Sequence, residues 1–127
     1  MQQNHLFEYA VIRVVPRVER EEFLNVGVIL YCSKLNFLQV MTAINYERLA
    51  AFCDQLDIRQ VEENLQAYAR ISVGGEDAGP IGKLDRASRF RWLTATRSTV
   101  VQSSKVHPGF CTDPHETLVR LFTQLVL

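Results

Sequence analysis

Hydrophobic and polar residues alternate along the first third of the chain, and this pattern predicts three β-strands. The first spans residues 7–15, where F-E-Y-A-V-I-R-V-V is rich in aromatic and β-branched residues. The third spans residues 37–42 and forms an antiparallel hairpin with the second across the turn-like residues 33–36. Gly27, in the middle of the second strand, suggests a bulge or a close backbone approach. That strand, residues 23–32, has one side formed by Leu24, Val26, Val28, Leu30 and Cys32.

After the third predicted strand, apolar residues recur at helical spacing. Residues 46–56 predict one helix, and Asp57 is suited to cap the N-terminus of a second. Four of the six glycines then fall within residues 73–82, which predicts a mobile loop. We expect a short helix over residues 85–95 and a fourth strand over residues 98–103.

The last part of the chain predicts an extended loop over residues 105–112 and a final helix. Asp113 caps that helix, Pro114 lies in its first turn and Glu116 completes a capping-box spacing. The whole order predicts an α+β fold, with a mainly antiparallel sheet of about four strands packed with helices on one face. We expect a single domain spanning residues 1–127.

Composition narrows the class of protein. The chain has 127 residues, 47% of them hydrophobic, which suits a globular core and disfavours a disordered, fibrous or disulfide-rich protein. We find neither a membrane-spanning run nor a signal peptide, and we therefore expect a small cytoplasmic protein. The three cysteines lack a C-x-x-C pair, which favours reduced thiols.

The zero net charge hides an uneven distribution. Residues 1–64 carry 6 basic and 9 acidic side chains, whereas residues 65–127 carry 8 and 5. Between Lys83 and Lys105 there are six basic residues and a single acidic one, Asp85. This segment either packs against the acidic front half, which we favour, or forms a face that binds anions.

Three residues near the C-terminus are of types that bind metal ions or serve as a nucleophile and its base. His107, Cys111 and His115 lie within nine residues, and zinc accepts such ligands. The nearby Asp113 is better used as a helix cap, so we predict no metal site. A nucleophilic Cys111 with His107 as its base is weaker still. The common nucleotide-binding and hydrolase motifs are absent from the sequence.

Arg13 is more informative, because it interrupts an apolar strand. A buried guanidinium needs a carboxylate, a carbonyl or a bound anion. We favour a structural ion pair with Glu22 or Glu8 over a ligand contact. A second basic segment, Arg89-Phe-Arg-Trp-Leu-Thr94, interleaves arginines and aromatics. It either stacks nucleic-acid bases or, as we favour, is a helix that buries its apolar residues.

Two blocks of the sequence resemble a bacterial family described as domain of unknown function 3037. The first is Tyr9-Ala-Val-Ile-Arg-Val-Val-Pro16 with Glu21-Glu-Phe-Leu-Asn-Val-Gly-Val28. The second begins at Phe90-Arg-Trp-Leu-Thr-Ala95 and continues to the final helix. Thr96 and Lys105 depart from the prolines expected there. The resemblance implies a stand-alone cytoplasmic protein without an established activity, and an association of some members with HipA-type kinases.

The matched blocks suggest where a site would form. We hypothesise one polar cluster suited to an anion such as phosphate, made of the embedded polar residues Arg13, Asn25, Arg91, Arg97, Ser98, Gln102 and His107. Arg89 and Trp92 are the candidate interaction face. We favour a non-enzymatic binding or adaptor domain with a protein partner, for which a HipA-like kinase is the candidate. A homodimer is a further candidate assembly.

Two other functions stay open at this point. The first is an anion- or nucleic-acid-binding module that uses the segment 83–105. The second, which we rank last, is an enzyme centred on His107, because the sequence shows no pair of residues suited to general acid–base catalysis. No cofactor is expected.

Overall fold

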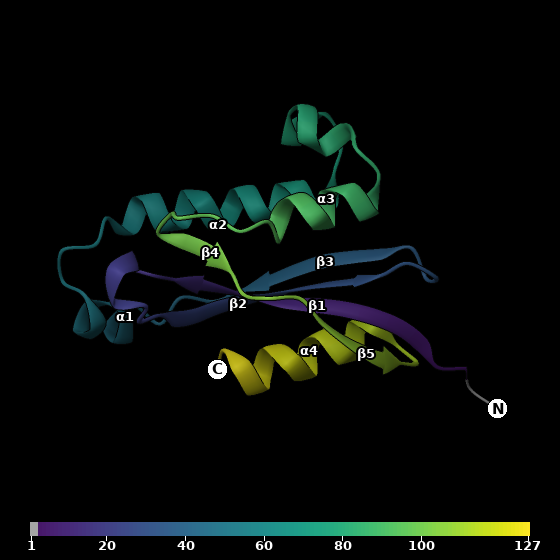
Figure 1. Cartoon of the computed structure of the whole chain (residues 1–127), viewed down its shortest axis with the longest axis horizontal. Helices are drawn as coiled ribbons and strands as arrows, with labels where there is room; N and C mark the ends of the chain where they lie inside the picture. The colour runs from purple at the N-terminus through teal and green to yellow at the C-terminus, as the bar shows by residue number, and fades with distance from the viewer. Residues whose placement is uncertain (1–2) are drawn as a thin grey trace.

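A computed structural model describes residues 3–127 and shows an antiparallel five-stranded sheet between helices (Figure 1). The strands are β1 (His5–Val14), β2 (Leu24–Cys32), β3 (Phe37–Thr42), β4 (Val101–Ser103) and β5 (His107–Cys111). The helices are α1 (Tyr46–Phe52), α2 (Ile58–Val73), α3 (Arg86–Leu93) and α4 (Pro114–Leu125). Among the described residues, no helix has the length and apolar character needed to cross a membrane.

β1 is the central strand, and two short strands share one of its sides. β2 pairs along the other side and β3 lies outside β2. β5 pairs with residues 5–9 of β1, whereas β4 pairs with residues 12–14. Ser104 spans the break: its backbone N–H donates to the Val11 carbonyl at 2.8 Å, and its Oγ accepts from the Val11 N–H at 2.8 Å. This side of the sheet is therefore continuous although the strand is interrupted.

Two hydrophobic clusters lie on opposite faces of the sheet (Figure 1). Ile12, Ile29 and Leu93 are fully buried in the cluster beneath α2 and α3. Leu30 and Leu118 are fully buried in the cluster between the sheet and α4. Each such side chain contributes roughly 1.5–3 kcal/mol through its burial. The predicted α+β class and antiparallel sheet are confirmed, but helices cover both faces rather than one.

A β-bulge in β2 decides which residues face each cluster. The register pairs Ile12 with Gly27 and Arg13 with Asn25, which leaves Val26 without an opposite residue. The predicted bulge or close approach at Gly27 is confirmed, since a Cβ there would lie 2.8 Å from a carbonyl oxygen of β3. The prediction that alternate residues from Leu24 to Cys32 share one side of β2 is wrong. The extra residue at the bulge shifts the alternation, so residues before and after it face opposite sides. Leu24 and Val26 point toward α2 and α3, whereas Val28, Leu30 and Cys32 point toward α4.

Short polar side chains begin the helices, as the sequence predicts. Asp57 accepts from the Gln60 N–H at 3.3 Å, and Asp113 accepts from two backbone N–H groups of α4. Asp85 caps α3, and the hydrogen bonds that it receives from Ser88 lower the pKa of its carboxyl. These caps satisfy helix N–H groups that have no partner within the helix.

Several predicted boundaries differ from those observed. The helix predicted over residues 46–56 ends at Phe52, and the fourth strand begins at Val101 rather than at residue 98. The segment 105–112 contains strand β5 instead of being only a loop. Its proline and glycine hide this in the sequence, because the strand is defined by pairing with distant β1. Residues 73–82 include short 3-10 turns, which project above α3 (Figure 1).

Candidate anion-binding site

Three of the predicted site residues form one row across the sheet. Arg13 lies opposite Asn25 on β2 and opposite Gln102 on β4. Directly opposite residues of antiparallel strands project to the same face, so the three side chains lie side by side. This is the face that carries α4, because Asn25 Nδ2 donates to the Leu125 carbonyl at 3.1 Å. The bulge in β2 places Asn25 in this row.

Arg13 lies at the centre of the row, and no carboxylate of the described residues forms an ion pair with it. Its guanidinium carbon stands 4.2 Å from the centre of the Phe23 ring, in cation–π geometry. The predicted ion pair with Glu22 or Glu8 is wrong: within residues 3–127 the one ion pair joins Glu22 to Arg20. Glu8 is five positions from Arg13 on the same strand and therefore projects from the opposite face.

A cavity of about 360 Å³ opens beside this guanidinium. Its lining is Arg13, Val15, Val18, Glu21, Phe23 and Gln102. Glu21 is its acidic residue, and it makes no ion pair with Arg13 among the residues described. Glu21 adopts a left-handed backbone conformation, with φ of 56°.

Two buried polar atoms of the row have no hydrogen-bond partner within the described chain. They are Nε of Arg13 and Oδ1 of Asn25, one donor and one acceptor on directly opposed residues. Gln102, in contrast, donates through Nε2 to the Thr99 carbonyl at 2.6 Å. Leaving a buried polar atom without a partner destabilises the fold. The row therefore contains one donor and one acceptor whose hydrogen bonds are not made by the described chain.

Arg89, unlike Arg13, has hydrogen-bond partners within the described part of the protein. Its predicted place on an exposed interaction face is wrong. The side chain is buried, and Nη1 donates to the Ile71 and Ser72 carbonyls, both at 2.9 Å. Nε donates to the Leu84 carbonyl at 3.1 Å. The two bonds from Nη1 satisfy carbonyls at the C-terminal end of α2, where a positive charge is also favoured by the helix dipole.

Arg97 and Trp92 form a second local arrangement. The Arg97 guanidinium carbon lies 4.2 Å from the centre of the Trp92 ring, and the group donates to carbonyls at the end of α3. Arg97 also reaches the Tyr68 hydroxyl at 3.5 Å. Burial raises the pKa of Tyr68, an effect that the positive charge of Arg97 opposes. Trp92 is 38% exposed, but one face of its ring is covered.

The other predicted site residues are dispersed. Arg91 is exposed on α3, and Ser98 is exposed before β4. His107 lies opposite Tyr9 on β5, with 5.3 Å between the ring centres. The seven predicted polar residues therefore do not form one cluster, and the structure assembles three of them: Arg13, Asn25 and Gln102. Phe23 and Glu21 were missed by the sequence argument, although Phe23 begins the predicted second strand and is 45% exposed.

The residues considered for metal or covalent chemistry diverge. In the described part of the chain, no three His, Cys, Asp or Glu residues lie close enough to hold a metal ion. The imidazole of His115 faces Gln39 at 3.4 Å, and Cys111 is buried. Burial, together with the nearby Cys32, raises the pKa of the Cys111 thiol, which lowers its reactivity.

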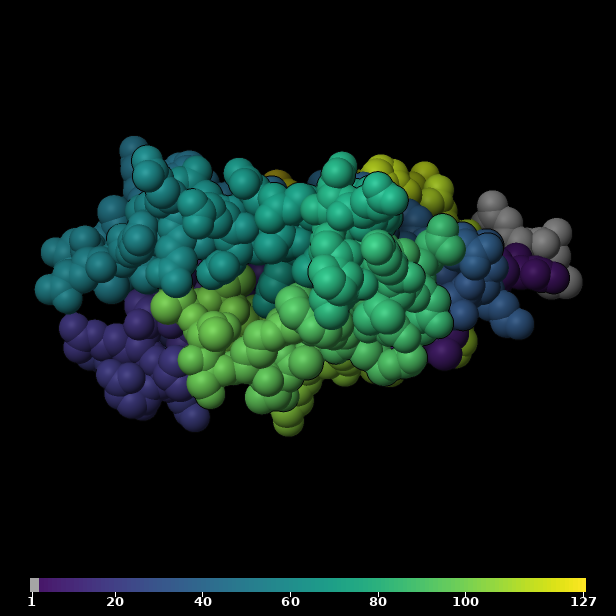
Figure 2. Space-filling model, turned by 90° about the horizontal axis from the view of Figure 1, so that it is seen from above, coloured from purple at the N-terminus to yellow at the C-terminus, as the bar shows by residue number. Residues whose placement is uncertain are grey.

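A second hollow is lined in part by the same segment of the chain, at residues 16–22. Seen from above, it opens between the purple residues near 20 and the teal residues near 54 (Figure 2). Its volume is about 270 Å³ and its lining includes Arg17, Arg20 and Cys53. The ion pair of Arg20 with Glu22 already neutralises part of its charge. The Arg13 cavity is therefore the better candidate for an anion.

Comparison with known proteins gives a single result. Residues 9–126 match the model of a family described as protein of unknown function (DUF3037). No curated protein and no solved structure matches the chain. The match covers both sequence blocks and every residue of the Arg13 site, and the chain belongs to this family of proteins of unknown function.

Proposed function

We propose that this protein is a non-enzymatic binding module that holds an anionic group at the Arg13 cavity. The observation that carries the proposal is a partly buried guanidinium that faces a cavity without a carboxylate partner among the described residues. Removing a charge from water is costly unless an opposite charge or hydrogen bonds compensate. A bound carboxylate or phosphate supplies both, because its oxygens accept from the guanidinium.

The lining of the cavity supports binding rather than chemistry. Phe23 and the two valines provide apolar contacts, and Gln102 provides a polar one. Neither a histidine nor a cysteine is among the lining residues, and Glu21 is the one carboxylate there. The cavity volume lies at the lower end of the range for small-ligand sites. It suits an anionic head group with a few attached carbon atoms.

The competing nucleic-acid function draws less support from the geometry. Arg89 and Arg97, two of the six basic residues between Lys83 and Lys105, are committed to capping helices α2 and α3. Strong dependence of DNA or RNA binding on salt would favour this alternative. A HipA-like kinase partner and a bacterial, cytoplasmic origin stay predictions of the sequence resemblance, and an anionic group on a partner protein would unite the adaptor role with the Arg13 site.

The proposal is tested by stabilisation of the fold. Inorganic phosphate and acetate are added separately, at constant ionic strength, during denaturant unfolding of the wild type, Arg13→Gln and Arg91→Gln. At about one hundred times its Kd, a bound anion raises the free energy of unfolding by about 2.7 kcal/mol. We expect this gain in the wild type and in Arg91→Gln, but not in Arg13→Gln.

Arg91→Gln is the matched control, since it removes an equal charge from an exposed position. It also corrects for the general stabilisation that phosphate gives through exclusion from protein surfaces. The two anions distinguish phosphate from carboxylate as the preferred group. Equal stabilisation of all three proteins would refute the proposal.

A further inference from the structure

β3 is the outermost strand on its side of the sheet, and within residues 3–127 no further strand pairs with the outer row of its backbone groups. The Ala43 N–H donates to the Val26 carbonyl at 2.8 Å, so the residues that bond to β2 are those in phase with Ala43. Hydrogen-bonded and non-hydrogen-bonded pairs alternate along an antiparallel ladder. The amide and carbonyl groups of Leu38, Val40 and Thr42 therefore point away from β2.

This edge lacks the features that prevent strand pairing. β3 reads F-L-Q-V-M-T, without a proline or a charged residue, and its six-residue register with β2 is regular. The opposite side of the sheet is protected, because β4 and β5 are short, separated by a break that includes Lys105, and interrupted by Pro108. Natural proteins use such short strands, lysines and prolines to block an exposed edge. β3 is thus available for pairing.

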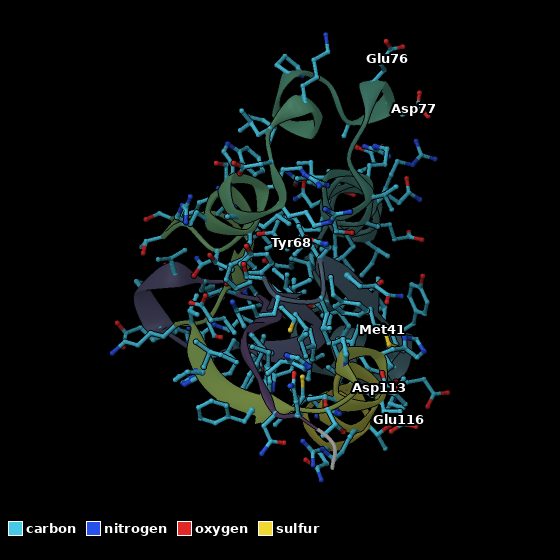
Figure 3. All side chains as sticks on the ribbon, turned by 90° about the vertical axis from the view of Figure 1, so that its right-hand side faces the viewer. Met41, Tyr68, Glu76, Asp77, Asp113 and Glu116 are labelled. Carbon is cyan, nitrogen blue, oxygen red and sulfur yellow. The ribbon has the colours of Figure 1, made fainter. Side chains whose placement is uncertain are left out.

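Two helices pack beside this edge, and the side chains that they expose are mostly polar. Figure 3 shows β3 at the side of the sheet, between α2 above and α4 below, with Met41 beside α4. The side chains of β3 are mostly half-buried by these two helices. Val73, at the end of α2, is 82% exposed, and Val119 of α4 is 38% exposed. Val73 and Val119 are thus the large apolar side chains that the two helices expose, among mostly polar neighbours.

We propose that β3 pairs in antiparallel fashion with β3 of a second copy, about a two-fold axis, to join two five-stranded sheets. An identical strand supplies the matching donors and acceptors in this arrangement, as a self-complementary two-fold interface requires. Because β3 is uncharged, self-pairing places no like charges opposite each other, which would destabilise a strand pair. This assembly goes beyond anion binding and does not depend on it.

The test is the oligomeric state of the full chain, measured by analytical ultracentrifugation over a wide range of concentrations. Thr42 is exposed and its N–H points outward, so Thr42→Pro removes a donor to the second copy while keeping the bonds to β2. Thr42→Lys adds a charge at the same position. Phe110→Lys is the control, because Phe110 is 70% exposed on the opposite edge of the sheet.

We expect a wild-type dimer that both Thr42 variants convert to monomer and that Phe110→Lys leaves intact. Hydrogen exchange of the wild type adds a measurement that needs no variant: the amides of Leu38, Val40 and Thr42 become protected as the concentration rises. The proposal is overturned by a monomeric wild type, by a dimer that survives both Thr42 variants, or by a dimer that Phe110→Lys dissociates.

Discussion

Arg13 and Arg89 are both withdrawn from full contact with water, yet their surroundings differ in kind. Arg89 donates three hydrogen bonds to backbone carbonyls and so joins the end of α2 to the segment before α3. Arg13 stacks on Phe23, faces a cavity, and has a buried Nε without a partner among the described residues. The difference teaches that a buried arginine is structural when the protein itself satisfies it, and a binding candidate when it does not.

The largest expected effect comes from replacing each arginine by methionine, which keeps the apolar length of the side chain. Arg89→Met leaves carbonyls of Ile71, Ser72 and Leu84 without their charged donor and should cost about 3 kcal/mol. Arg13→Met removes a charge that lacks a counter-charge and should change stability by less than about 1 kcal/mol. Denaturant unfolding measures both values. Equal losses in the two variants would break the comparison.

Gly74 tests how closely the fold fits around Arg89. Its φ of +83° disfavours a side chain, and a Cβ there would overlap the Arg89 guanidinium. We expect Gly74→Ala to cost about 2 kcal/mol. In the Arg89→Met background part of this penalty should disappear, because the more flexible thioether can move away. A double-mutant cycle measures this coupling, and strictly additive effects would show that Gly74 responds only to backbone strain.

Asn25 tests whether the Arg13 row also has a structural member. Asn25→Ala removes the hydrogen bond to the Leu125 carbonyl near the end of α4 and should cost about 1 kcal/mol. The same change removes the unpartnered Oδ1, which limits the loss. Thermal or denaturant unfolding reports the effect. A loss as large as that of Arg89→Met would mean that the row is mainly structural.

Glu21 provides the smallest expected effect. Its carboxylate lines the Arg13 cavity and opposes the entry of an anion. Glu21→Gln should strengthen phosphate binding by about threefold, which corresponds to the modest energy of charge interactions near a surface. Titration calorimetry or the stabilisation assay gives the ratio of the dissociation constants. Weaker binding in this variant would show that Glu21 supports the site instead of competing with its ligand.

The sequence predicted the features of the fold that depend on neighbouring residues. The hairpin of β2 and β3 and the caps Asp57 and Asp113 follow from local pattern, and these are confirmed. The roles of the two arginines depend on segments far apart in the chain. Arg89 bonds to carbonyls 17 and 18 residues earlier, and nothing near Arg89 in the sequence indicates this.

The candidate site was predictable only in part for the same reason. The sequence suggested Arg13 as a residue that needs a partner. Of the two carboxylates expected to pair with it, Glu22 pairs with Arg20 and Glu8 projects from the opposite face. The stack on Phe23 and the row with Gln102 arise from the chain path around the sheet. Strand β5 was missed because His107–Cys111 becomes a strand by pairing with β1, despite its proline and glycine.

The most direct test of the contrast is a nuclear magnetic resonance titration that follows the Nε–H signals of Arg13 and Arg89 in one sample. Inorganic phosphate is added at constant ionic strength and pH. We predict a saturable shift of the Arg13 signal, with the Arg89 signal unchanged because its donors are already bonded to backbone carbonyls. An Arg13 signal that does not move, or that moves only together with Arg89 and without saturation, would contradict anion binding at this site.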